Sequence, residues 1–112
     1  MTDVQHDVQQ VFAGLADSTR LQILDVLAMH GATTASTIAT ELPVTRQAIA
    51  KHLTVLERAG LVSSNRAGRE VRYVLLPARM EVASQWLSRV AEDWAVRLGT
   101  IAHATEGDPT PT

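Results

Sequence analysis

The segment Thr45-Arg-Gln-Ala-Ile-Ala-Lys-His-Leu-Thr-Val-Leu-Glu-Arg-Ala-Gly60 predicts one amphipathic helix with a capping residue at each end. Thr45 offers a hydroxyl to the backbone N–H groups of the first turn, and Gly60 is the residue type that ends a helix in the left-handed conformation. Ile49, Leu53 and Leu56 recur at helical spacing and are expected to face a core. The other side of this helix is therefore expected to be exposed.

That exposed side carries no acidic residue. It presents guanidinium, amide, methyl, ammonium and hydroxyl groups, which can meet base edges and phosphates in a major groove of DNA. An ordinary solvated helix face is the alternative interpretation. The residues on this side are Arg46, Gln47, Ala50, Lys51 and Thr54.

Charge is distributed unevenly along the chain. Residues 1–44 hold one base and five acids, residues 45–72 hold six bases and two acids, and residues 73–112 hold three bases and five acids. The three segments therefore carry net charges of −4, +4 and −2. A basic middle segment on an acidic body is typical of a protein that binds a polyanion in a fixed orientation.

The composition indicates one domain without covalent cross-links. A chain of 112 residues with 46% hydrophobic residues can form a single core, and the absence of cysteine excludes disulfides, thiolate metal sites and cysteine nucleophiles. No apolar run approaches the roughly 20 residues that span a bilayer. The first residues lack the features of a signal peptide, so we expect a cytoplasmic protein with no membrane partner.

Further helices are predicted before the quoted one. Apolar spacing predicts two helices before residue 31, the second of which begins at Asp17 or Ser18. Thr33 or Thr34 begins a short third helix. Pro43 then enforces a turn, because proline disfavours a helical residue before it. The third helix, this turn and the quoted helix make a helix-turn-helix.

After Gly60 the apolar period changes from helical to two. Residues 61–64 and 70–76 predict two strands of a β-hairpin, with residues 65–69 as the turn. A long helix follows from about residue 79 to 103. Residues 105–112 have the composition of a disordered end, which leaves one domain over residues 1–104.

This order of elements predicts a mainly α fold with a small β-hairpin, a winged helix-turn-helix. Residues 16–24, 49–62 and 68–75 resemble the ArsR/SmtB-type transcriptional regulators, through Ala16-Asp-Ser-Thr-Arg20 and His52-Leu-Thr-Val-Leu-Glu-Arg-Ala-Gly-Leu-Val62 in particular. The resemblance covers roughly residues 8–101. It implies a homodimeric DNA-binding repressor with extra N- and C-terminal dimerisation helices, released from its operator by a metal or another inducer.

The resemblance also assigns candidate contacts to DNA. The exposed helix residues pair with bases or touch only phosphate, and both interpretations stay open. His52 is either a packed histidine hydrogen-bonded to the fold or a DNA contact. The hairpin arginines either contact phosphate or the minor groove, or only solubilise the hairpin. The predicted DNA-binding residues are Thr45, Arg46, Gln47, Ala50, Lys51, His52, Thr54, Arg58, Arg66, Arg69 and Arg72.

Most ligands of the metal sites of that family are missing from this chain. One family site uses paired cysteines at the third helix, where this chain has none. Another uses acidic and histidine ligands on the last helix. His103 and Glu106 match one half of it, but Val90-Ala91-Glu92 stands where the other half requires an Asp-x-His pair. We expect no metal and no cofactor.

The chain ends supply a candidate dimer interface. The first and last helices each carry an apolar stripe, and together the stripes exceed what a small winged domain covers internally. Packing of the last helix on its own domain is one alternative, and a small-molecule pocket lined by the tryptophans is another. The residues concerned are Val4, Val8, Val11, Phe12, Trp86, Val90, Trp94, Leu98 and Ile101.

An enzyme is not expected. The sequence has no Gly-x-Ser-x-Gly motif, no glycine-rich phosphate loop and no carboxylate–histidine constellation. We expect a sequence-specific transcriptional regulator whose inducer is not a metal. Two alternatives stay open. One is a winged-helix protein-interaction module that does not bind DNA specifically, and the other is a zinc-type sensor of the same family.

Overall fold

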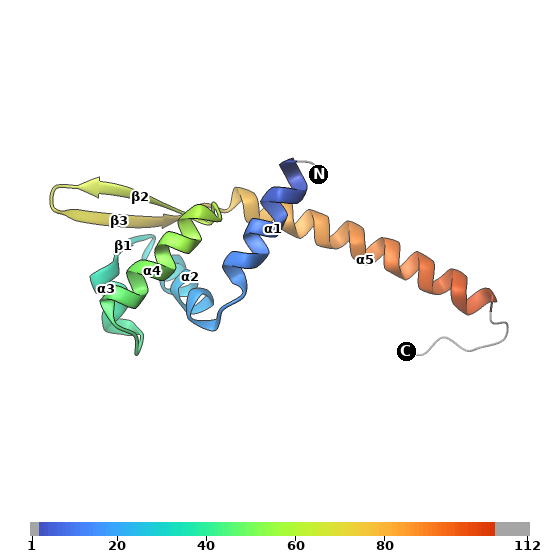
Figure 1. Ribbon diagram of the computed structural model, residues 1–112, viewed down its shortest axis with the longest axis horizontal. Coiled ribbons are helices and arrows are strands. Elements are labelled where there is room, and N and C mark those ends of the chain that lie inside the picture. The colour runs from blue at the N-terminus through green and yellow to red at the C-terminus, as the bar shows by residue number, and fades with distance from the viewer. Residues whose placement is uncertain (1–2, 105–112) are drawn as a thin grey trace.

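The computed structural model describes residues 3–104. The fold is mainly α with the expected β-hairpin, and the predicted helices and hairpin strands follow one another as expected. The hairpin belongs to an antiparallel sheet in the order β1-β3-β2. Figure 1 shows a winged domain from which the last helix projects. The predicted disordered tail, 105–112, lies outside the described residues. The elements are α1 (Asp3–Leu15), α2 (Ser18–His30), β1 (Ala32–Thr34), α3 (Ala35–Glu41), α4 (Arg46–Arg58), β2 (Val62–Ala67), β3 (Glu70–Leu75) and α5 (Ala78–Ala104).

Helix α4 has both predicted caps. Thr45 Oγ1 accepts a hydrogen bond from the backbone N–H of Ala48 at 3.1 Å. At the other end Gly60 adopts φ +77°, and the N–H of Leu61 donates to the carbonyl of Leu56 at 3.0 Å, as in a Schellman motif. The helix is therefore bounded by its own local sequence.

The structure also decides between the alternative caps of α2 and α3. Asp17 caps α2, because its Oδ1 accepts hydrogen bonds from the N–H groups of Thr19 and Arg20 at 2.8 and 3.1 Å. Thr34 caps α3, because its Oγ1 accepts from the N–H of Thr37 at 3.1 Å. Both helices therefore satisfy donors of the first turn through a side chain at the preceding position.

The sheet differs from the prediction in two respects. Strand β1 was not expected. It pairs with β3, with Thr33 opposite Tyr73. Strand β2 runs to Ala67, so the connection of the hairpin is Gly68 and Arg69 alone rather than residues 65–69. Gly68 has φ +66° and stands at the first central position of this turn, where glycine meets no steric penalty.

The core contains the predicted apolar face of α4. Its three fully buried members, Ile49, Leu53 and Leu56, pack in one cluster with α1, α2, α3 and the base of the hairpin. Val8 and Val11 require a correction, since their expected place was an interface with a second copy. They are 2% and 0% exposed in the single chain and belong to its own interior.

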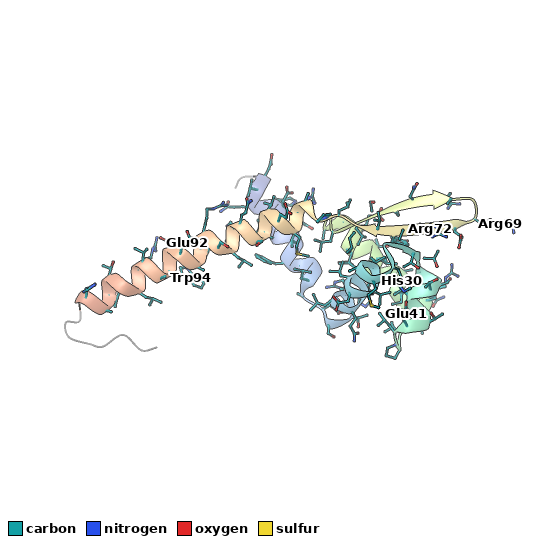
Figure 2. The ribbon with its side chains drawn as sticks, turned by 180° about the vertical axis from the view of Figure 1, so that it is seen from behind. His30, Glu41, Arg69, Arg72, Glu92 and Trp94 are labelled. Carbon is teal, nitrogen blue, oxygen red and sulfur yellow. The ribbon has the colours of Figure 1, made fainter. Side chains whose placement is uncertain are left out.

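Helix α5 divides into a packed half and a projecting half. Its 27 residues make it about 40 Å long. Phe12 of α1 meets Trp86 edge to face, with ring centroids 5.8 Å apart, whereas residues 91–101 are all exposed. Figure 2 shows Glu92 and Trp94 on this projecting half. Among the described helices, α5 included, none combines the length and apolar character needed to cross a membrane.

Candidate nucleic-acid interface

The outer face of α4 carries the predicted polar and basic side chains. Arg46, Gln47 and Lys51 are exposed, as are Ala50, Thr54 and Arg58. Two hydroxyls are engaged within the chain. Thr45 caps the helix, and Thr54 Oγ1 donates to the carbonyl of Ala50 at 3.1 Å. Arginine, glutamine and lysine therefore supply the strongest groups for recognition on this face.

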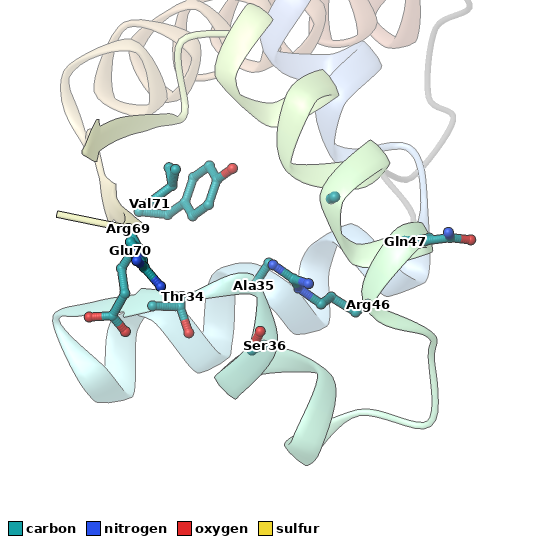
Figure 3. A pocket seen from close by; sticks show the side chains of 10 residues that line it. Thr34, Ala35, Ser36, Arg46, Gln47, Arg69, Glu70 and Val71 are labelled. Atoms are coloured by element: carbon teal, nitrogen blue, oxygen red, sulfur yellow. The ribbon is translucent and has the colours of Figure 1, made fainter. Parts of the chain in front are cut away.

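The start of α4 and the hairpin share one concave surface. A cavity of about 330 Å³ lies between the beginning of α3, the first turns of α4 and the hairpin tip. Figure 3 shows Arg46 extending from α4 toward Ala35, and Gln47 extending to the opposite side. The cavity therefore offers polar groups from three elements, among them the two guanidinium groups of Arg46 and Arg69 and the carboxylate of Glu70. Its lining is Thr34, Ala35, Ser36, Arg46, Gln47, Ala50, Arg69, Glu70, Val71 and Tyr73.

The hairpin arginines do not share one face. Arg66 stands opposite Val71, and Asn65 stands opposite Arg72. Opposed residues lie on the same face of a sheet and neighbours alternate, so Arg66 and Arg72 lie on opposite faces. Arg72 also has an ionic partner, since its Nη2 lies 3.6 Å from Glu70 Oε1. Arg69 stands in the connection at the tip, as Figure 2 shows.

His52 is held by the fold. Its Nδ1 lies 3.2 Å from Nη1 of Arg20, a hydrogen bond between residues 32 positions apart. The side chain of Arg20 also binds the carbonyls of Ala13 and Gly14 at the end of α1. His52 is therefore a packed histidine that is hydrogen-bonded to the fold. A contact of His52 with DNA stays a prediction. Arg20 was not predicted to be a site residue, although it is the lone base of residues 1–44.

The candidate dimer residues fall into two groups. Phe12, Trp86 and Val90 are half-buried where α1 meets α5, and Val4 is exposed at the start of α1. On the projecting half of α5, three large apolar residues remain more than half exposed in the single chain, at 63%, 65% and 57%. These are Trp94, Leu98 and Ile101.

Possible metal ligands are scattered. No group of three or more His, Cys, Asp or Glu side chains that could hold a metal ion occurs in residues 3–104. His103 is exposed on α5, and Glu106 lies outside the described residues. His30 Nε2 lies 2.6 Å from Glu41 Oε2, a pair that joins the ends of α2 and α3 and that Figure 2 shows. Two groups alone do not complete a tetrahedral site.

The known proteins that are similar to this chain belong to one class, the helix-turn-helix transcriptional regulators. A family model described as a helix-turn-helix domain matches residues 15–65. The HTH-type transcriptional regulator Rv2034 of Mycobacterium tuberculosis is 36% identical over 103 residues, which cover 90% of this chain and 92% of that protein. The transcriptional repressor SdpR of Bacillus subtilis is 31% identical over 80 residues, covering 71% of this chain and 88% of SdpR.

A solved structure agrees over nearly the whole chain. An ArsR-like transcriptional regulator from Rhodococcus sp. RHA1 is 41% identical with a TM-score of 0.83, and the match covers 96% of this chain and 100% of that one. These similar proteins are regulators, a class without enzymatic activity, and the family resemblance drawn from the sequence is confirmed. This chain belongs to the ArsR-like family of helix-turn-helix transcriptional regulators.

Proposed function

We propose that this regulator is a homodimeric repressor that reads a pseudo-palindromic operator and blocks a promoter. The observation that carries the proposal is the basic concave surface formed by α4 and the hairpin, on a chain whose other segments are acidic. Such a surface is attracted to the phosphates of DNA and repels basic partners. SdpR, which is similar over most of its length, is named a transcriptional repressor, and this supports repression.

The second copy binds along the projecting half of α5. Successive apolar residues at spacings of three or four share one face of this helix. Monomeric proteins seldom leave so large an apolar patch in water. A two-fold pairing along this face would place two α4 helices in successive major grooves about 34 Å apart. The stripe consists of Trp94, Leu98 and Ile101 on the projecting half and continues into the packed half through Leu87 and Val90.

Dimerisation is tested by a charge placed on the stripe. Leu98→Glu should weaken self-association measured by sedimentation at least about tenfold, since an unpaired charge is costly to bury. Val96→Glu is the matched control, because Val96 is 68% exposed and lies on the opposite side of α5. Dissociation by both variants alike, or a wild-type chain that is monomeric at micromolar concentration, would rule out this interface.

DNA binding is tested by fluorescence anisotropy and footprinting. Affinity for random duplex should fall steeply with salt, because binding releases counterions from the phosphates. The strongest genomic site should show a protected region with two-fold symmetry. A footprint without a dyad would contradict the proposal. Absence of salt-dependent binding would favour instead the protein-interaction module that does not bind DNA.

The signal that releases the repressor is not a metal in this proposal. The chain has no cysteine, so the soft-ligand site of the family is missing. On α5, Val90 and Glu92 replace the pair that would complete a site with His103. A ligand that prefers one packing of α1 on α5 offers the alternative, because it would change the spacing of the two α4 helices.

A further inference from the structure

A second cavity lies away from the surface of α4 and the hairpin. It has a volume of about 170 Å³ and lies between α1 and the packed half of α5. Val8, which is 2% exposed, forms its buried wall, and the edge-to-face rings of Phe12 and Trp86 border it. Gln5 and Gln9 complete the lining from exposed positions on α1. The cavity therefore has an apolar interior and amide groups at its rim.

The lining determines the chemistry of a ligand. None of the five side chains is ionisable, so the cavity offers no counter-charge for an anion or a cation. A primary amide has both donors and acceptors, so the rim can bind a hydroxyl, a carbonyl or an amine of a neutral molecule. Aromatic edges and a valine suit a ring or a short branched chain rather than a polar core.

The volume determines the size of a ligand. An apolar cavity of about 150 Å³ holds one benzene molecule, and sites for drug-sized ligands are about 300 Å³ or more. The cavity of about 170 Å³ therefore fits a single ring with one substituent. We propose that the space between α1 and α5 is a binding site for a small neutral ring compound with one hydrogen-bonding group, held by Val8, Phe12 and Trp86 and oriented by Gln9.

This site does not rest on the proposed repression, since binding is measurable without DNA. Cyclohexanol is a suitable probe because it is neutral, has one ring and one hydroxyl, and does not absorb light at the wavelengths that excite tryptophan. The chain has two tryptophans, so in Trp94→Phe the fluorescence reports Trp86 alone. Titration of Trp94→Phe with cyclohexanol should change the fluorescence of Trp86 until it saturates. We expect a Kd of about 1 mM, because a ligand with seven non-hydrogen atoms has little binding energy.

Ligand controls separate the site from general solvent effects. Cyclohexanecarboxylate has the same ring and a negative charge, and should bind at least about tenfold more weakly because the lining holds no cation to offset the hydration that its carboxylate loses. Equal responses to the two compounds, or a response that stays linear without saturation, would overturn the proposal.

Two variants test the residues. Gln9→Leu should weaken cyclohexanol binding about threefold or more through the lost hydrogen bond. Gln22→Leu changes an equally exposed glutamine on α2 and should leave binding unchanged. Val8→Phe should fill the cavity and abolish binding, with a thermal unfolding transition showing that the variant is folded. Binding that is the same in Gln9→Leu, Gln22→Leu and the unsubstituted chain would overturn the site.

A second copy of the chain is the rival occupant of this cavity. In that case the dimer would not respond to cyclohexanol, whereas the dissociated Leu98→Glu variant would bind it. That result would overturn the proposal. Equal affinity in the dimeric chain and in Leu98→Glu would support a site that belongs to the single chain.

Discussion

Nη1 of Arg20 lies 3.2 Å from Nδ1 of His52, so one side chain joins α2 to the helix that carries the candidate DNA contacts. Nε and Nη2 of the same guanidinium donate to the carbonyls of Gly14 and Ala13 at 2.6 and 3.2 Å. The last carbonyls of a helix lack partners within it. Arg20 therefore satisfies the end of α1 and fixes the position of α4 relative to it.

Removal of this arginine should destabilise the fold. Arg20→Ala leaves the carbonyl of Gly14 and Nδ1 of His52 without this donor, while the carbonyl of Ala13 keeps the N–H of Ala16 at 3.4 Å. The free energy of unfolding in urea should fall by about 1–3 kcal/mol. Arg97→Ala is the matched control, since among the described residues Arg97 has an ion pair with Asp93 alone, on the exposed part of α5, and its loss should change stability by less than about 0.5 kcal/mol. Equal losses in the two variants would contradict the role assigned to Arg20.

Gly60→Ala should strain a side-chain contact as well as the backbone. Gly60 has φ +77°, and a Cβ there would lie 2.5 Å from Cδ and Nη1 of Arg79. The positive φ alone should cost about 1 kcal/mol or more. The contact should add about 1 kcal/mol, because Arg79 must give up the carbonyl of Ala59 and its ion pair with Asp7.

A double-mutant cycle isolates that contact. In an Arg79→Ala background the cost of Gly60→Ala should fall by about 1 kcal/mol, since the obstructing side chain is gone. If the cost is unchanged in that background, the strain lies in the backbone alone and the contact has no energetic role.

Local signals made most of the fold predictable. The caps and apolar spacing of α4 lie within sixteen consecutive residues, so its bounds could be inferred from that segment. Strand β1 could not be inferred, because it has three residues and its partner, β3, lies about 40 positions further along. The hairpin was predicted, but its turn was predicted to span residues 65–69 and is shorter in the structure. The prediction was too long because Asn65 and Arg66 have little strand propensity.

The candidate site, like the fold, was predictable only in part. The outer residues of α4 follow from helical period alone. The link between Arg20 and His52 does not, because it joins positions 32 apart and neither residue belongs to an apolar pattern. Burial of Val11 within the single chain likewise depends on how α1 packs, since an apolar stripe is the same in sequence whether it meets its own domain or a second copy.

Asp17 should make stability depend on pH in the acid range. The N–H of Arg20, and secondly that of Thr19, donate to its carboxylate and lower its pKa from the ordinary 3.8, while burial acts in the opposite direction. A lowered pKa in the folded chain stabilises it above pH 3.8, and this contribution is lost as pH falls through the folded pKa. The stability advantage of the wild type over Asp17→Asn should therefore shrink on acidification.

The measurement is urea unfolding at several pH values. Asp25→Asn is the control, because Asp25 is exposed on the same helix and accepts no hydrogen bond among the described residues. An advantage over Asp17→Asn that stays constant from neutral to strongly acid pH would show that the charge of Asp17 does not contribute.

Metals should have little effect on operator binding. Zinc, cobalt and cadmium should change the affinity less than about threefold, below the 1–3 kcal/mol typical of allosteric coupling. Anisotropy with labelled operator measures this while tryptophan fluorescence follows the metal. A stoichiometric zinc response that releases DNA and disappears in His103→Ala would show that α5 does complete a site.

The helix and the hairpin should divide recognition between them. Gln47→Ala and Arg46→Ala remove the α4 groups that we propose contact base edges, and each should cost about 1–3 kcal/mol on the cognate site while relaxing base preference. Arg69→Ala removes the guanidinium that we propose contacts phosphate from the hairpin tip. It should weaken cognate and random DNA alike and lower the slope of log affinity against log salt by about one.

Arg72→Ala is the matched control for the hairpin. Arg72 lies on the face opposite Arg66 and already pairs with Glu70, so its loss should change the salt slope less than the loss of Arg69 does. Anisotropy titrations of all four variants at several salt concentrations, on cognate and scrambled duplexes, measure both quantities. If Arg69→Ala changes base preference and Gln47→Ala does not, the hairpin reads the sequence and α4 holds the backbone, which is the reverse of the assignment made from the exposed face of α4.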